Sequence, residues 1–251
     1  MTFARETFIV FRRQLRMNLR NPAWVIIGML QPVLYLLLFG PLLEPLVQQF
    51  GAANAYTFFV PGLLVQLGIF GAMFAGFSLI GEWREGVVEA ERVTPASRTA
   101  LLLGRMCRDV LQLLAQALIL IGLGLVLGMR ASAFGLLLGL LLTLLIGSAC
   151  AAGSNAVALT TKSEDVMAPL MNMVMMPVLL LSGILLPMTI GPDWLQRVSD
   201  VIPVKHVVTA VRSTFAGDLA TSSVLWGSVW TAALFGLAVW WGTRVFRREN
   251  A

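Results

Sequence analysis

Charged residues are scarce in this chain: Asp, Glu, Lys and Arg make up 12% of its 251 residues, whereas hydrophobic residues make up 58%. Globular domains carry roughly a quarter charged residues, so this composition excludes an ordinary water-soluble domain and predicts an integral membrane protein. No acidic or basic residue falls in the middle third of any predicted span. We therefore expect no intramembrane proton relay, ion pump or voltage sensor, because these depend on such charges.

Histidine and cysteine are almost missing as well. His206 is the sole histidine, and the two cysteines, Cys107 and Cys150, stand in apolar stretches without a CxxC spacing. This pattern favours two buried, small apolar side chains over a metal or redox pair. It also argues against an intramembrane enzyme, which needs clustered catalytic groups. A G-x-x-x-x-G-K-[ST] phosphate loop is also missing. We expect no catalytic, metal or cofactor site on this chain, which must conduct passively or take its energy from a partner.

Long apolar stretches are what the chain has in abundance. Six of them reach the roughly 20 residues that a helix needs to cross the hydrocarbon core of a bilayer. They run over about 24–43, 58–80, 109–127, 133–159, 167–186 and 224–241. We predict one all-α, polytopic membrane domain over residues 1–251, with six transmembrane helices.

Residues 1–21 predict an amphipathic helix that lies in the membrane interface. On a helix, its side chains form an apolar stripe of Phe8, Phe11, Leu15 and Leu19 beside a basic stripe of Arg12, Arg16 and Arg20. Such a helix buries its apolar stripe at the lipid boundary and directs its guanidinium groups toward lipid phosphates. Membrane lipids are therefore expected partners.

Basic residues are divided unequally between the loops. With the N-terminus inside, fourteen fall on the inside, namely Arg5, Arg12, Arg13, Arg16, Arg20, Arg84, Arg92, Arg98, Arg105, Arg108, Lys162, Arg244, Arg247 and Arg248, and four on the outside, namely Arg130, Arg197, Lys205 and Arg212. Cytoplasmic segments carry the excess of Lys and Arg, so both termini are predicted to be cytoplasmic. The same asymmetry accounts for the net charge of +5, and no nucleic acid partner is expected.

Small residues recur at helical spacing in three pairs: Ala72 and Gly76, Gly124 and Gly128, and Gly135 and Gly139. Such pairs allow helix backbones to approach closely in a membrane. We interpret them as packing within one subunit rather than as a dimer seam.

Residues 81–98 form a charged segment between the second and third spans. On a helix, its charged side chains fall on separate faces, Glu82, Glu85 and Glu89 on one and Arg84 and Arg92 on another. Thr94 and Pro95 are suited to begin the next helix. A short charged helix that projects from two spans is a suitable lever for a soluble partner. A solvated loop with ordinary orientation charges is the alternative that these residues leave open.

Residues 187–215 predict two short helices on the outside, between the fifth and sixth spans. Ser182, Gly183 and Pro187 interrupt the apolar stretch before them, Trp194 lies in the first short helix, and Pro203 begins the second. Both helices are too short to cross a bilayer, which suggests a re-entrant element buried by protein or facing a cavity. We predict an external gate here, with an inert interfacial hairpin as the alternative.

Aromatic and methionine side chains in two spans make a candidate substrate path, formed by Phe70 and Phe74 in the second span and Met171 and Met175 in the fifth. Flexible thioethers suit varied apolar ligands. Gap filling around Pro169 and Pro177 is the alternative reading of the methionines.

Several short motifs follow one another in a particular order along these spans. They are Val60-Pro61-Gly62-Leu63, Glu85-Gly86 with Glu89, Thr94-Pro95-Ala96-Ser97-Arg98, Ser182-Gly183, Pro187, Trp194-Leu195, Pro203 and Arg212. In this order and spacing the chain resembles a permease, the membrane subunit of the type-two ABC export family, and most closely the daunorubicin-resistance type. The resemblance covers essentially the whole chain.

The resemblance implies a transmembrane permease domain that works as a dimer, with a second copy of the chain or a paralogue. Two copies of a separate ATPase subunit would hydrolyse ATP with Mg²⁺, so this chain would be no enzyme. The main contact with the ATPase would be a coupling helix within residues 81–98, around Glu85, Gly86 and Glu89. A shorter contact would lie at 161–165, with Lys162, Glu164 and Asp165.

The resemblance further implies outward movement of an amphipathic small molecule, such as a drug, across the bacterial cytoplasmic membrane. The same family also exports lipids and lipid-linked glycans, which stay open as alternatives. A passive channel or secondary carrier is the alternative of a different class.

Overall fold

The structure is a computed structural model that describes residues 3–20, 23–49, 54–92, 97–185 and 187–249. Within these ranges all regular secondary structure is helical, as the apolar patterns predict. The elements are α1 (Phe3–Arg20), α2 (Ala23–Gln49), α3 (Ala55–Arg84), α4 (Val87–Arg92), α5 (Arg98–Val126), α6 (Ala133–Thr161), α7 (Glu164–Leu181), η1 (Met188–Ile190), α8 (Asp193–Asp200), α9 (Pro203–Ala216) and α10 (Ser222–Glu249).

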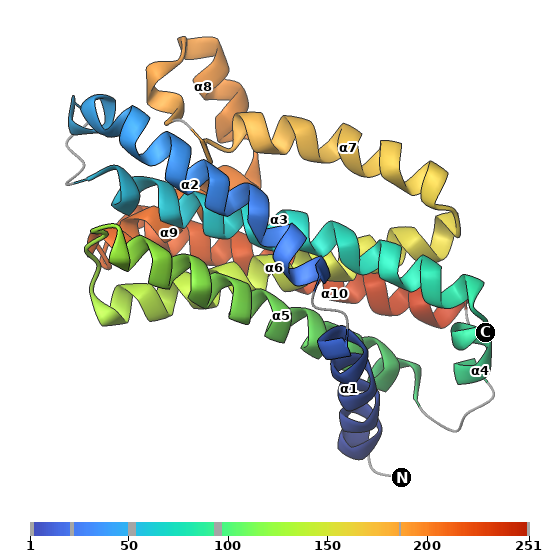
Figure 1. Cartoon of the computed structure of the whole chain (residues 1–251). Coiled ribbons are helices and arrows are strands. Elements are labelled where there is room, and N and C mark those ends of the chain that lie inside the picture. The colour runs from blue at the N-terminus through green and yellow to red at the C-terminus, as the bar shows by residue number, and fades with distance from the viewer. Residues whose placement is uncertain (1–2, 21–22, 50–53, 93–96, 186, 250–251) are drawn as a thin grey trace.

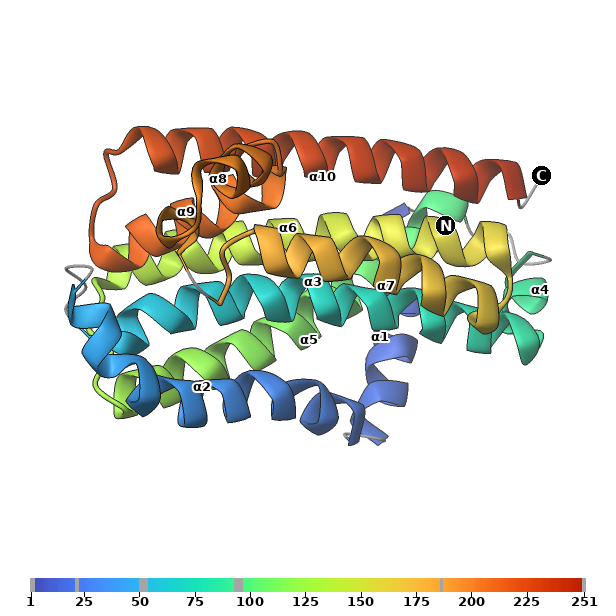
Figure 2. The same ribbon diagram turned by 90° about the horizontal axis from the view of Figure 1, so that it is seen from above.

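Six helices, α2, α3, α5, α6, α7 and α10, are long and apolar enough to cross a membrane, which confirms the six predicted spans. They lie alongside one another with their axes roughly aligned, whereas α1 crosses the first part of α5 (Figure 1, Figure 2). We call one end of this bundle the α4 end; it holds α4, the α6–α7 junction and the C-terminus (Figure 1). The opposite end, which holds α8, is called the α8 end.

The third span begins earlier than the apolar pattern predicts, and this corrects one expectation. Ser97 caps α5 by accepting a hydrogen bond from the Ala100 amide at 3.3 Å, and the candidate span runs over Thr99–Val126. Arg108 and Asp109 therefore lie at the start of the middle third of this 28-residue span, where no charged residue was expected. The helix accommodates this carboxylate because Arg108 pairs with it at 2.7 Å.

The core is built around α3, which buries 71% of its most apolar window. Leu63, Leu64 and Ile69 are among its fully enclosed side chains. α6 packs directly on α3 because two glycines face each other: a Cβ atom on Gly147 would lie 3.3 Å from the Cα of Gly68. Such backbone proximity is the expected role of small residues between membrane helices.

Three spans at the periphery remain largely uncovered. α2, α7 and α10 bury only 22%, 11% and 17% of their most apolar windows. Their exposed side chains are large and apolar, including Leu38, Leu42, Met173, Leu180, Leu225 and Leu237. In a membrane, faces of this kind contact lipid or another membrane protein.

Two of the predicted small-residue pairs lie at helix crossings inside this subunit. A Cβ atom on Gly139 would meet the hydroxyl oxygen of Thr214 on α9 at 2.8 Å, and one on Gly76 would meet the carbonyl oxygen of Ser154 on α6 at 2.7 Å. Gly135 likewise faces the Thr214 carbonyl. These contacts support the interpretation of the pairs as internal packing.

α1 packs against α5 through Val10 and Gln14, which are buried. Gly104 of α5 makes the approach possible, because a Cβ atom there would lie 2.7 Å from the Cβ of Val10. Phe8 and Leu19 of the apolar stripe remain exposed. The location of α1 in a membrane interface stays a prediction, as does the re-entrant location of α8 and α9.

Candidate functional site

The turn between α3 and α4 is a tight, glycine-dependent bend at the α4 end. The Glu85 amide donates to the Gly81 carbonyl at 3.0 Å, and the Gly86 amide donates to the Trp83 carbonyl at 3.1 Å. Gly86 has a φ of +72°, a left-handed conformation that costs other residues about 1–2 kcal/mol. The motif Glu85-Gly86 therefore ends α3 and sets the direction of α4, and both residues are exposed.

The α6–α7 junction forms a second turn at the same end. Lys162 adopts a left-handed φ of 51° and its amide donates to the Ala158 carbonyl at 2.9 Å, which ends α6. Glu164 and Asp165 then occupy the first turn of α7, where carboxylates interact favourably with the positive end of the helix dipole. Asp165 is exposed to solvent.

The two turns meet, so the two predicted contact regions form one surface. Arg84 Nη1 lies 3.1 Å from Glu164 Oε1, and Lys162 Nζ lies 5.9 Å from the centre of the Trp83 ring. We call the group Arg84, Glu85, Gly86, Lys162, Glu164 and Asp165 the α4-end surface. These residues were predicted from two separate segments of the sequence, whose proximity only the folded chain shows.

Glu82 differs from the other predicted contact residues because it is buried. It belongs to the last turns of α3, where one carboxylate oxygen accepts from Arg105 Nη2 of α5 and the other from Gln14 Nε2 of α1, both at 2.7 Å. Arg105 is only 1% exposed. Glu82 therefore joins three helices beneath the α4-end surface and does not present its carboxylate to solvent.

α1 has two further attachments near this junction. Glu6 Oε2 accepts a hydrogen bond from the Ser97 amide at 2.9 Å, and Asn18 Nδ2 donates to Gln112 Oε1 at 2.6 Å. The N-terminal helix is thus attached both to the segment that leads into α5 and to the body of α5.

Four predicted contact residues cannot be placed. The side chains of Glu89 and Arg92 on α4, and all of Thr94 and Pro95, lie outside the described residues. Their roles stay predictions.

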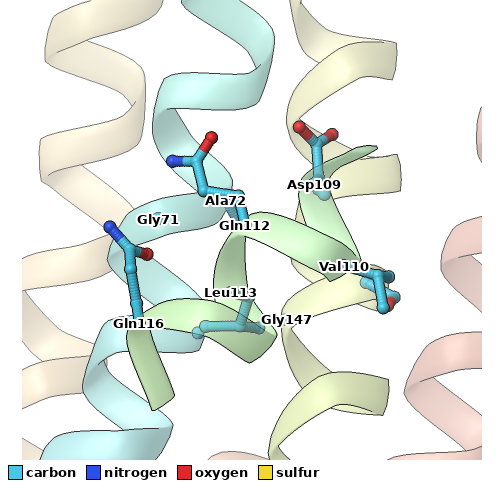
Figure 3. Close-up of a pocket in the computed structure, with 11 residues that line it drawn as sticks. Gly71, Ala72, Asp109, Val110, Gln112, Leu113, Gln116 and Gly147 are labelled. Carbon is cyan, nitrogen blue, oxygen red and sulfur yellow. The ribbon is translucent and has the colours of Figure 1, made fainter. Parts of the chain in front are cut away.

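A small polar cavity of about 30 Å³ lies between α3, α5 and α6. Figure 3 shows Asp109, Gln112 and Gln116 projecting from α5, with Gly71 and Ala72 of α3 beside them. A cavity needs about 10–15 Å³ of such space to hold one water molecule, so it has room for about two. Among the described atoms, Asp109 Oδ2 has no hydrogen-bond partner.

The candidate substrate path is not gathered into this cavity. The described residues that line the cavity include none of Phe70, Phe74, Met171 and Met175. Phe74 is 49% exposed, whereas Met171 is buried beside the last turns of α3 and Met175 is partly buried in the main core. In this conformation the methionines pack against neighbouring helices, in line with the gap-filling alternative, and a path role stays a prediction.

The predicted gate lies at the α8 end, where α7 stops in a sharp turn. The Ser182 amide donates to the Val178 carbonyl at 2.9 Å, and Gly183 has a φ of +75°, which directs the chain inward. Ile184 then enters the core with 1% exposure. The end of α7 is also fixed to α8, because Ser199 Oγ donates to the Leu181 carbonyl at 2.6 Å.

Arg212 of α9 holds the same turn from the other side. Its Nη2 donates to the Ile184 carbonyl at 2.8 Å and its Nε to the Phe58 carbonyl of α3 at 3.3 Å. Its guanidinium carbon also lies 3.9 Å from the centre of the Phe58 ring. Desolvation disfavours the charged form and lowers the pKa of Arg212 to about 9, so the side chain is still cationic at neutral pH.

The remaining gate residues have simpler positions. Pro187 precedes η1, and Pro203 occupies the first turn of α9, where its missing amide hydrogen removes no helical hydrogen bond. Trp194 is 65% exposed on α8, whereas Val207 and Val211 of α9 are fully buried. α9 is therefore part of the core, which could not be predicted from its short length.

Comparison with known proteins identifies the family. The family described as ABC-2 type transporter matches residues 5–216. A daunorubicin resistance ABC transporter permease protein of Streptomyces coeruleorubidus is 27% identical, covering 92% of this chain and 82% of that protein. A probable doxorubicin resistance ABC transporter permease protein of Mycobacterium tuberculosis is 26% identical, over 92% of this chain and 84% of its own length.

A more distant relative is a probable multidrug ABC transporter permease of Escherichia coli, which is 26% identical over 67% of this chain and 45% of that protein. The family match covers most of the chain, and the six candidate spans account for most of the helical structure. The chain is therefore a multi-pass membrane protein of the ABC-2 type transporter family.

Proposed function

We propose that this chain is the permease subunit of an ATP-driven exporter that moves an amphipathic small molecule outward across the bacterial cytoplasmic membrane. The family membership supports a transporter that depends on an ATPase. The names of the relatives, which refer to daunorubicin and doxorubicin resistance, support a drug-like substrate for this chain.

The α4 end is proposed to face the cytoplasm. Fourteen of eighteen basic residues fall on the side of the N-terminus when the six spans are counted, and cytoplasmic segments carry such an excess. The α8 end then faces outward, and both termini are cytoplasmic.

The observation that carries the proposal is the α4-end surface. Two turns that are far apart in the sequence meet there through Arg84 and Glu164, and Glu85 and Asp165 remain exposed beside them. An exposed charged surface at the end of a long apolar bundle suits a soluble partner. We propose that it receives one of two ATPase subunits, which bind ATP and Mg²⁺, and that a second permease copy or a paralogue completes the transporter.

α3 offers a direct route from this surface to the opposite end. It runs without interruption from Ala55 at the α8 end to Arg84 at the α4 end. Displacement of α4 would therefore move α3 against α6 and α5, and the transporter would change between two packing arrangements whose populations the ATPase controls.

Charge reversal at the α4-end surface tests the proposal. The double substitution Glu85→Lys and Asp165→Lys is expected to reduce co-purification of the ATPase at least tenfold. Like charges placed opposite each other in an interface cost several kcal/mol, and a loss of about 1.4 kcal/mol lowers an affinity tenfold. Asp218→Lys, an exposed carboxylate at the α8 end, is the matched control and should leave the complex intact.

Transport in proteoliposomes supplies the second measurement. A fluorescent amphipathic amine should move only when the ATPase and ATP are present. Flux without ATP would instead identify a passive channel or carrier, and ATP-dependent movement of a labelled lipid in place of the amine would identify a lipid exporter.

A further inference from the structure

The turn that follows α7 is held in place by the guanidinium group of Arg212, which hydrogen-bonds to backbone carbonyl groups. Arg212 binds the carbonyl groups of Ile184 and Phe58, and among the residues that the structure describes no carboxylate forms an ion pair with it. A guanidinium group forms its strongest bonds with carboxylate or phosphate. Here its hydrogen-bonding capacity is used to join backbone segments of three different elements.

The three elements around Arg212 differ in how firmly they are held. α9 is anchored in the core by Val207, Val211 and Phe215, which are fully buried, and α3 is the central helix. α7, by contrast, buries only 11% of its most apolar window. Because α7 is the least covered of these helices, its turn would be the part to move, while Arg212 and Phe58 would stay in place.

Gly62 of α3 provides the space that this arrangement needs. A Cβ atom at this position would lie 2.6 Å from the Ile184 carbonyl oxygen and 3.2 Å from Arg212 Nη2. The distance to the carbonyl oxygen is too short for a real Cβ atom, so any larger residue would push the Ile184 carbonyl group away from α3 and from the guanidinium. Gly62 and Gly183, whose φ is +75°, together allow the turn to reach Arg212.

We propose that Arg212 is a positioning residue that latches the α7 turn, residues 182–185, against α3 and α9, and that release of the Ile184 carbonyl opens the α8 end. Within the proposed function this end is the exit of the exporter, so the physiological meaning of the latch rests on that function. A hydrogen bond to a charged group typically changes an equilibrium by about 10- to 100-fold. Loss of the latch is expected to raise the open fraction by a factor of this order.

Chemical labelling of Ser182 measures the opening directly. Ser182 is 1% exposed when the latch is closed. Ser182→Cys is introduced into a variant that carries Cys107→Ala and Cys150→Ala. A membrane-impermeant maleimide is then added to cells from which the layers outside the cytoplasmic membrane have been removed. Labelling should be slow with Arg212 intact and at least tenfold faster in Arg212→Gln. Arg212→Lys should be labelled at an intermediate rate, because one ammonium group cannot replace the planar guanidinium group and its several donors.

A second substitution tests the latch while Arg212 is retained. Gly62→Ala should accelerate labelling to a similar extent, because the added methyl group displaces the Ile184 carbonyl. In the double variant Gly62→Ala with Arg212→Gln, the labelling rate should rise by less than the two single effects combined, because both substitutions release the same carbonyl group. Arg197→Gln, which removes the same charge from an exposed position on α8, should leave the labelling rate unchanged.

General unfolding is distinguished by a reporter on α9. Thr214 is fully buried, so Thr214→Cys should stay protected in Arg212→Gln if only the turn opens. The proposal is overturned if Ser182→Cys is labelled at the same rate with and without Arg212, or if both reporters become accessible together. Because labelling requires neither an ATPase nor a substrate, the latch can fail while the exporter function stands, and the reverse also holds.

Discussion

At the scale of single residues, the Glu82 carboxylate connects three helices. It accepts hydrogen bonds from Gln14 and Arg105 and so joins α1, α3 and α5 directly beneath the α4-end surface. Breaking a buried pair from one side is costly because the remaining charge loses its compensation. Glu82 and Glu85 are three positions apart, yet the buried Glu82 is expected to stabilise the fold, whereas the exposed Glu85 is expected to contribute little to stability.

Glu82→Gln is expected to lower the free energy of unfolding by about 3 kcal/mol, since the buried Arg105 would lose the charged oxygen to which it donates. Glu85→Gln should change it by less than about 0.5 kcal/mol, as is usual for exposed positions. Thermal unfolding of the detergent-purified variants measures both. Equal stability of the two variants would contradict the assignment of Glu82 to the interior.

At the scale of helices, the close approach of α6 to α9 decides how the α8 end is assembled. Gly135 and Gly139 of α6 face Thr214 and Phe215 of α9 without room for another carbon atom. α9 is too short to span a membrane, and its buried valines depend on this contact and on α10 for their cover. The α6–α9 crossing therefore supports the element that carries Arg212.

Gly135→Ala should destabilise the protein by about 1–3 kcal/mol, the usual cost of overpacking a well-filled interior, because its methyl group would meet a backbone carbonyl that cannot rotate away. Gly122→Ala, at a helical position with no neighbour within 4 Å, is the control and should be neutral or slightly stabilising. Chemical or thermal unfolding in detergent compares them. A larger loss in the Gly122 variant would show that the crossing is less tight than described.

At the scale of the whole molecule, the two ends have different chemistry. At the α4 end, exposed charged turns from separate parts of the chain meet through Arg84 and Glu164, whereas at the α8 end Ser199 and Arg212 hold the turn after α7 by hydrogen bonds to its backbone. A bundle of this kind can transmit a displacement from one end to the other, because α3 extends between them without interruption.

The proposed orientation predicts a specific labelling pattern in a background without Cys107 and Cys150. Asp218→Cys, on the exposed α9–α10 connection, should react with an impermeant maleimide in intact cells. Asp165→Cys, at the α4-end surface, should react only after the membrane is permeabilised. The opposite pattern would invert the topology and exclude the cytoplasmic ATPase contact proposed for the α4 end.

Much of the architecture could be predicted from the sequence because it depends on local patterns. The six apolar stretches predict the spans, and Ser182, Gly183 and Pro203 correctly mark the ends of helices. The beginning of α5 was misplaced because Arg105, Arg108 and Asp109 interrupt the apolar pattern. Ion pairs with Glu82 and between Arg108 and Asp109 allow these charged residues to lie within a membrane-spanning helix. An average of hydropathy along the sequence does not show such pairs.

The candidate site could be predicted only in part. Arg84 and Glu164 were identified separately, and their contact became visible only in the folded chain. Gln14, the pairing of Arg105 with Glu82 and the positioning role of Arg212 were missed. An arginine within the apolar stripe of a short helix was the available signal for Arg212, but its acceptor at Phe58 lies 154 positions away in the sequence.

The amino-acid sequence by itself determined that this protein is a bundle of six membrane helices with charged connections, because the length of an apolar run and the thickness of a bilayer decide this locally. Only the tertiary structure decided which charges are exposed and which are enclosed. Glu82 and Glu85 differ in this respect because burial depends on what the neighbouring helices place opposite each side chain. The packing of the whole bundle sets that arrangement, through glycine contacts such as those of Gly62 and Gly104.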